Sequence, residues 1–137
     1  MPEIITGSCL CGAIRFSYEG PIGSAAYCHC TDCRRCTGSA FNISVALEAA
    51  LFKIIGGSPS SYTKQADSGH ELTRHFCPDC GSPIYTSSPK HPDRVYVKAG
   101  IINDPTLIRP AYQSWALSAV PWSNIDAGLK TYDKARG

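Results

Sequence analysis

The stretch Cys77-Pro78-Asp79-Cys80-Gly81 is the strongest structural signal in this chain. Two cysteines three positions apart on a tight turn place both sulfur atoms within reach of one tetrahedral ion, at about 2.3 Å for each Zn–S bond. Gly81 permits the backbone to fold beneath the ion, where a side chain would obstruct it. Because such a turn supplies only two ligands, the sequence predicts that a second pair of cysteines comes from elsewhere.

The obvious second pair lies in Cys9-Leu10-Cys11-Gly12. On a strand, residues two apart project from the same face, so both thiolates can point at one ion. Pairing the two distant stretches makes a closed site of four thiolates, and closed zinc sites are structural and contribute to folding. Two alternatives stay open at this point, namely buried free thiols in either pair and iron in place of zinc.

A third group, Cys28-His29-Cys30-Thr31-Asp32-Cys33, places three sulfur atoms within six residues. Two are at strand spacing, and the third follows at a predicted helix start; we expect this helix to stop near Gly38. Three ligands leave the fourth position open, as a catalytic zinc requires, and thiolate-rich coordination suits an incoming thiol. Cys36 is a possible fourth ligand, since it lies three residues after Cys33, and both metals would then be structural.

The spacing and expected compartment of the eight cysteines favour metal over disulfides. Cysteines this close together seldom meet the distance and dihedral requirements of a disulfide without strain. The sequence starts without the basic and apolar regions of a secretory signal, so we expect a cytoplasmic protein kept under reducing conditions. No apolar run approaches the roughly 18 residues of a membrane span. The net charge of +2 is too small to argue for nucleic acid or an acidic membrane.

The remaining sequence predicts a β-rich single domain. A chain of 137 residues with 43% hydrophobic and 18% charged residues is long enough for one core and too apolar to be disordered. Many short strands punctuated by Gly and Pro indicate an all-β or mainly β architecture with short helical turns. The predicted strands are 13–18, 41–47, 51–55, 72–76, 83–86 and 94–97. Another strand is predicted to begin at 61–63, residues 25–27 are predicted to be extended, and residues 112–115 have strand-like character.

Other polar and aromatic residues are candidates for binding a ligand. Arg34 and Arg35 could bind a substrate carboxylate near the middle cysteines, although a solvated turn explains them equally well. His29 alternates away from its flanking cysteines, which favours a solvent-facing or supporting role over ligation. The remaining histidines lack ligand-like spacing. Three aromatics either line a ligand cleft or pack in the core: Tyr112, Trp115 and Trp122.

The three cysteine motifs, taken with their flanks at residues 7–16, 28–35 and 76–83, resemble the glutathione-dependent formaldehyde-activating enzyme family, which includes the domain of centromere protein V. The resemblance covers roughly residues 5 to 132, which we treat as one domain. It implies a mainly β, β-tent (Mss-four-like) fold with two zinc sites. By motif position, the structural zinc ligands are Cys9, Cys11, Cys77 and Cys80, and the ligands of the catalytic zinc are Cys28, Cys30 and Cys33.

The resemblance also implies an activity. Members of the family form and break a carbon–sulfur bond by adding glutathione to formaldehyde, so we expect a carbon–sulfur lyase-type enzyme with a small thiol as its partner. The alternative is a non-catalytic zinc module that binds another protein, which Cys36 as a fourth ligand would favour. Gln113 departs from the family pattern, because a histidine often stands there. Neither the residues nor the resemblance predicts an oligomeric state.

Overall fold

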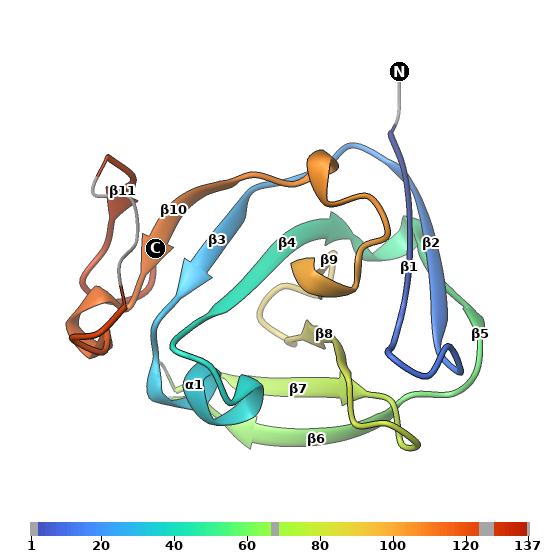
Figure 1. Cartoon of the computed structure of the whole chain (residues 1–137), viewed down its shortest axis with the longest axis horizontal. Coiled ribbons are helices and arrows are strands. Elements are labelled where there is room, and N and C mark those ends of the chain that lie inside the picture. The colour runs from blue at the N-terminus through green and yellow to red at the C-terminus, as the bar shows by residue number, and fades with distance from the viewer. Residues whose placement is uncertain (1–2, 67–68, 124–127, 137) are drawn as a thin grey trace.

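The computed structural model describes residues 3–66, 69–123 and 128–136, and within them the chain is built mainly of β-strands with one short α-helix (Figure 1). The mainly β fold predicted from the sequence is therefore confirmed. The strands are β1 (Glu3–Ser8), β2 (Arg15–Gly20), β3 (Ala25–Cys28), β4 (Asn42–Glu48), β5 (Phe52–Gly56), β6 (Ser60–Gln65), β7 (Glu71–Phe76), β8 (Pro83–Ser87), β9 (Arg94–Lys98), β10 (Pro110–Ser114) and β11 (Lys130–Thr131).

The strands form two sheets of unequal size. The smaller sheet has the order β1-β2-β5 and is antiparallel. The larger sheet has the order β11-β10-β3-β4-β9-β8-β7-β6, in which β10 runs parallel to both of its neighbours and the other pairs are antiparallel. The larger sheet curls, so that β6 and β7 lie near the end of β3 where α1 begins (Figure 1).

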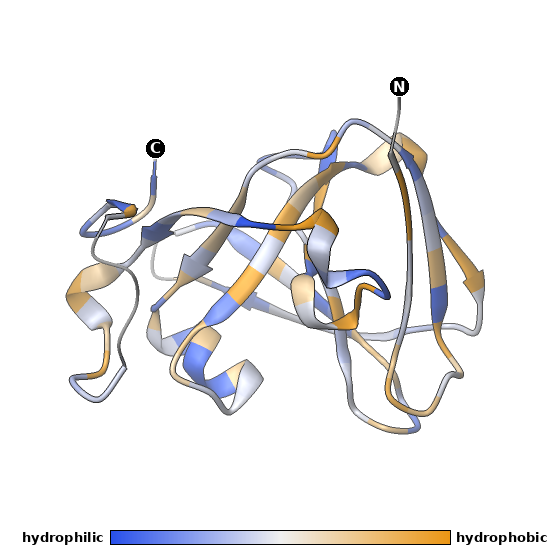
Figure 2. Cartoon of the chain, turned by 45° about the horizontal axis from the view of Figure 1, so that its top comes forward, coloured by the Kyte–Doolittle hydropathy of each residue, from blue (hydrophilic) through white to orange (hydrophobic). Residues whose placement is uncertain are grey.

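The hydrophobic core lies between the smaller sheet and one face of the larger one. Side chains of a strand alternate between its two faces, and in β9 Val95 and Val97 are buried in this core. Phe16 of β2 is fully buried there, and its ring lies 5.3 Å from the ring of Phe52. Figure 2 shows hydrophobic residues along strands of the chain. The opposite face of the larger sheet is left for polar side chains.

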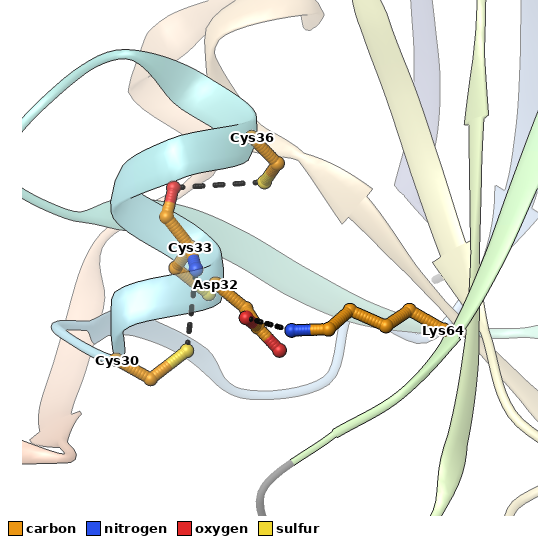
Figure 3. A network of polar contacts seen from close by, with 5 residues as sticks. All are labelled: Cys30, Asp32, Cys33, Cys36 and Lys64. Carbon is orange, nitrogen blue, oxygen red and sulfur yellow. Dashed lines mark hydrogen bonds and ion pairs between the residues drawn. The ribbon is translucent and has the colours of Figure 1, made fainter.

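The predicted helix exists as α1 (Thr31–Thr37). It follows β3 directly and ends at Gly38, which adopts the left-handed conformation that favours glycine at a helix terminus. None of its residues is fully buried, so packing alone does not fix its position. A 2.6 Å ion pair between Asp32 and Lys64 links the first turn of α1 to β6 across the curl of the sheet (Figure 3).

The sequence predicted most of the strands but missed two. Strand β1 has no clear alternation of its own, and it is held by six residue pairs with β2, from Glu3↔Gly20 to Ser8↔Arg15. Strand β11 is only two residues long and pairs with β10. No helix among the described residues has the length and apolar character to cross a membrane.

Candidate metal centres and the adjoining cleft

Two turns from distant parts of the chain bring four cysteines together. The turn at residues 9–12 connects β1 to β2, and the turn at residues 77–81 connects β7 to β8. The four sulfur atoms lie within 4.8 Å of one another, and they belong to Cys9, Cys11, Cys77 and Cys80. The pairing expected from the sequence is thus present in the structure as one cluster.

The local geometry of the first pair differs from the prediction. Strand β1 ends at Ser8, so Cys9 and Cys11 lie on a turn and not on a strand. The backbone N–H of Gly12 donates to the carbonyl of Cys9 at 3.2 Å, as the N–H of Gly81 donates to the carbonyl of Cys77 at 2.9 Å. Both glycines have a positive φ, 82° and 79° respectively. This left-handed backbone favours glycine at both positions, where an added Cβ would meet no other protein atom within 4 Å.

The sulfur–sulfur distances fit one tetrahedral ion. The sulfur of Cys11 lies 3.6 Å from that of Cys9 and 3.7 Å from that of Cys77. Four sulfurs at about 2.3 Å from a zinc ion would be separated by about 3.8 Å along each tetrahedral edge. A disulfide would need about 2.05 Å. The donor set therefore suits a four-thiolate zinc site and not a pair of disulfides.

Ser82 supports this cluster from outside. Its hydroxyl oxygen lies 3.2 Å from the Cys80 sulfur and accepts a hydrogen bond from the backbone N–H of Leu10 at 3.1 Å, which ties the two turns together. Hydrogen bonds from the Ser82 hydroxyl, and then from the backbone N–H groups of Ser82 and Cys11, lower the pKa of Cys80 to about 5. Hydrogen bonds that stabilise a thiolate favour metal binding, because the ligand form is the thiolate.

We predict that Ser82→Ala weakens zinc binding at the four-sulfur cluster while the protein stays folded. Loss of a supporting hydrogen bond to a metal ligand typically lowers affinity by about 10–100-fold. Competition with a chromophoric chelator would measure the change. Ser87→Ala is the matched control, because the Ser87 hydroxyl contacts His75 and no cysteine. Equal affinity in Ser82→Ala and the native protein would contradict the prediction.

The second cluster lies where β3 meets α1. Cys28 is the last residue of β3, Cys30 is the N-cap of α1, and Cys33 lies in its first turn. Their three sulfur atoms are within 4.8 Å of one another. The backbone N–H of Cys33 donates to the Cys30 sulfur at 3.3 Å. The strand end and the helix start thus hold three sulfurs on one side of a single position, as the spacing predicted.

The thiols of Cys28, Cys30 and Cys33 form hydrogen bonds with one another, so their pKa values depend on each other. Hydrogen bonds first from Cys30 and then from Cys33 lower the pKa of Cys28 to about 3. The same interactions raise the pKa of Cys33, because its thiol donates to Cys28 and to Cys30. One thiolate is therefore stabilised by two neighbouring thiols. Such a cluster is suited to bind a divalent cation, which would replace these protons.

Cys36 does not join this cluster. Its sulfur contacts the carbonyl oxygen of Cys33 at 3.5 Å and is exposed on the next turn of α1. Figure 3 shows its side chain at the opposite end of the short helix from Cys30. The close group contains only Cys28, Cys30 and Cys33. With Cys36 outside the cluster, three cysteines remain as candidate ligands for one ion.

A cleft of about 620 Å³ opens beside the three-sulfur cluster, and both Cys28 and Cys33 line it. Its floor is the face of the larger sheet opposite to the core, where small side chains on neighbouring strands leave room. Register pairs Ala26 of β3 with Ser44 of β4, and Ser44 with Lys98 of β9. The small residues of this floor are Ser24, Ala26, Ser44 and Ala46.

The cleft is cationic. Its lining within the described part of the chain includes no Asp or Glu, and its arginine and lysine residues are Arg74, Arg94, Lys98 and Arg136. The Arg136 guanidinium also lies over the ring of Tyr112, 4.7 Å from its centroid. These basic side chains come from β7, β9 and the C-terminal segment, and they face the cysteine cluster across one cavity. An anionic ligand is the chemistry that this lining favours.

The residues predicted for carboxylate binding lie elsewhere. Neither Arg34 nor Arg35 is among the residues that line the cleft. Both belong to α1, where Arg35 is exposed and the Nε of Arg34 is buried without a partner among the described residues. The basic residues of the cleft were not identified from the sequence, because they lie far from the cysteine motifs along the chain. Alternation in β9, with Arg94 and Lys98 on the face opposite to two valines, was the available signal.

His29 is buried, which excludes the solvent-facing role allowed by the sequence. Its Nε2 lies 2.9 Å from the side-chain oxygen of Gln113, and its ring packs edge-on against Phe41. It therefore supports the segment between Cys28 and Cys30 from the side away from the cleft.

Among the aromatic candidates, Tyr112 lines the cleft, while Trp122 is 71% exposed and lies outside the core.

Comparison with known proteins shows a family and a fold that this chain shares. A family model described as glutathione-dependent formaldehyde-activating enzyme matches residues 4–118. A Halomonas elongata protein, named as a candidate glutathione-dependent formaldehyde-activating enzyme, is 32% identical over 113 residues, which cover 78% of this chain and 70% of the relative. The crystal structure of a Rhodobacter sphaeroides protein superposes with a TM-score of 0.57 at 18% identity, covering 93% of this chain and 98% of the other, which shows a shared fold.

Proposed function

The chain belongs to the glutathione-dependent formaldehyde-activating enzyme family, and from this membership we propose that it is a zinc-dependent carbon–sulfur lyase-type enzyme. The proposed reaction joins a glutathione-type thiol to a small carbonyl compound such as formaldehyde, or reverses that addition. Cys9, Cys11, Cys77 and Cys80 would hold a structural zinc, and Cys28, Cys30 and Cys33 a catalytic one.

The observation that carries the proposal is the different surroundings of the two clusters. Cys28 and Cys33 line the cleft, whereas none of the four cysteines of the other cluster does. Cys9 and Cys77 are instead buried against Ile14 and Ile84. A complete set of four ligands is typical of a structural ion, and an incomplete set that opens onto a cavity is typical of a catalytic ion.

The chemistry follows from the groups at the cleft. When bound by the three cysteines, zinc supplies a Lewis-acidic centre that lowers the pKa of an incoming thiol. The sulfur then forms a bond to the carbonyl carbon, and the carbonyl oxygen becomes a hydroxyl after it receives a proton. The cysteines of the chain act as metal ligands in this scheme and not as nucleophiles.

The cations of the cleft supply the binding of the thiol. Glutathione carries two carboxylates, and guanidinium groups bind carboxylates by paired hydrogen bonds. Arg74 on β7 and Arg94 on β9 both line the cleft. We therefore propose that they take the role that the sequence had suggested for Arg34 and Arg35.

We predict that Arg74→Gln raises KM for glutathione with little change in kcat, since it removes binding energy that the ground and transition states share. Loss of one charge-assisted hydrogen-bonding group should raise KM on the order of tenfold. Steady-state kinetics of thiol addition would measure both constants. Arg35→Gln is the matched control, because this exposed arginine does not line the cleft. A larger effect of Arg35→Gln than of Arg74→Gln would reverse the assignment.

A non-catalytic zinc module is the alternative, and it predicts no open coordination position. Zinc-edge X-ray absorption with and without glutathione separates the two functions. Under the proposed function, the mean number of sulfur neighbours per zinc rises when glutathione is added. Unchanged coordination, together with no consumption of formaldehyde and glutathione, would favour the module.

A further inference from the structure

Lys98 is a buried cation on the floor of the cleft. It is the last residue of β9, only 7% exposed, and its Nζ donates to the Asn42 side-chain oxygen at 2.5 Å. Register places it beside the three-sulfur cluster, because Lys98 pairs with Ser44 while Asn42, two residues earlier on β4, pairs with Cys28. The amino group of Lys98 thus lies on the cleft side of the larger sheet, next to the end of β3 that carries Cys28.

No carboxylate within residues 3–66, 69–123 and 128–136 forms an ion pair with Lys98. A buried ammonium without a counter-ion is costly, and its usual response is a lowered pKa. Burial lowers the pKa of Lys98, and Arg74 on β7 lowers it further. The opposing groups are Cys33 and Cys36 on α1 and Cys28 on β3, which raise it without reversing the direction. The neutral form of the Lys98 amine is therefore easier to reach than that of a solvent-exposed lysine.

We propose that Lys98 is a further catalytic residue, the group that carries the proton between the thiol and the carbonyl oxygen. This role rests on the proposed function. The neutral amine of Lys98 accepts the proton that the thiol loses on binding. After the carbon–sulfur bond forms, the Lys98 ammonium gives that proton to the oxygen, and the amine is regenerated. In the reverse direction the amine removes the hydroxyl proton while the carbon–sulfur bond breaks, and the ammonium then returns that proton to the released thiolate. No oxidant or other reactant is needed.

The surroundings of Lys98 match this role better than a purely electrostatic one. Three arginines already supply positive charge to the cleft, so a purely electrostatic role would not need a lysine as well. A lysine side chain shifts its pKa readily when buried, which makes it suited to act as an acid or a base. The single neutral partner, Asn42, orients the amine without fixing its charge.

The test counts protons when glutathione alone binds to the zinc-loaded protein. Calorimetry in buffers of different ionisation enthalpy gives the number released. At a pH below the pKa of Lys98, where the lysine is already charged, we expect the native protein to release one proton for each glutathione bound. At a pH between the pKa of Lys98 and the pKa of the thiol, we expect no net release of protons. In Lys98→Arg and Lys98→Gln one proton should be released across the whole range, and kcat should fall by at least about 100-fold.

Asn42→Asp keeps Lys98 but gives it a carboxylate partner, which raises its pKa. This variant should also release one proton across the range, so the test does not depend on replacing the lysine. Lys53→Gln is the control, because Lys53 is exposed on β5, outside the cleft, and should behave as the native protein does.

Each outcome has one meaning. One proton released by the native protein at every pH, or native behaviour in Lys98→Arg, would overturn the role of Lys98 while leaving the proposed function intact. Absence of glutathione binding to the native protein would overturn the proposed function itself, and the role of Lys98 with it.

Discussion

Cys77→Ser is expected to leave the protein unfolded when it is made, with both metal positions lost. Cys77 is fully buried, and its sulfur lies 3.7 Å from that of Cys11 on the other turn. Zinc binding at a four-thiolate site contributes about 10–16 kcal/mol to folding in small domains, and the total stability of a domain is only about 5–15 kcal/mol. Losing one buried ligand therefore removes more stability than the rest of the fold can supply.

Elemental analysis and far-ultraviolet circular dichroism would measure this result. The matched control is Cys36→Ser, which removes an exposed cysteine outside both clusters and should retain the native fold and zinc content. A folded Cys77→Ser protein with an unchanged melting temperature would show that the four cysteines pack as free thiols. Colour in the purified native protein would instead indicate iron at this site.

Cys33→Ser is expected to have the opposite pattern, with the fold retained, one metal lost and activity abolished. Cys33 lies on α1, which has no fully buried residue, so little core packing depends on it. Two sulfur ligands hold zinc much less tightly than three, and without the ion the thiol loses its source of activation. The zinc content should fall to half of the native value, and turnover of glutathione with formaldehyde should fall below detection.

The comparison of Cys33→Ser with Cys77→Ser tests the division of the two sites directly. Melting temperature and zinc content should separate them, because only the Cys77 variant loses the core. If Cys33→Ser unfolds and releases both ions, the three-sulfur cluster is structural, and the assignment of an open catalytic site is wrong. Cys36→Ser serves again as the control, since its exposed sulfur contacts the Cys33 carbonyl and, among the described residues, belongs to neither cluster.

The two cysteine clusters were predictable from the sequence because each motif encodes its own local geometry. In Cys77-Pro78-Asp79-Cys80 the spacing alone brings two sulfurs together on one turn. The pair at Cys9 and Cys11 was also identified, although for an incorrect reason, because it lies on a turn with glycine at positive φ and not on a strand. A short chain segment between two ligands limits where they can be, whichever backbone conformation joins them.

The cleft was not predictable in this way. Arg34 and Arg35 were chosen because they follow the cysteines in the sequence, yet the direction of a side chain depends on the helix that carries it. Arg74 and Lys98 reach the cleft because the larger sheet curls and because register sets which face of each strand is polar. Those pairings join segments that are far apart in the chain, and local spacing contains no information about them.

The sequence by itself therefore determined which cysteines lie close together and that the fold is mainly β. Both depend on local features, since a turn or an alternating strand pattern involves only a few neighbouring residues. Only the tertiary structure decided what surrounds the three-sulfur cluster, including a cationic cleft, a buried lysine and a helix linked to β6 by the ion pair of Asp32 with Lys64. The physical reason is that sheet order and curvature depend on packing of the whole core, which no single segment specifies.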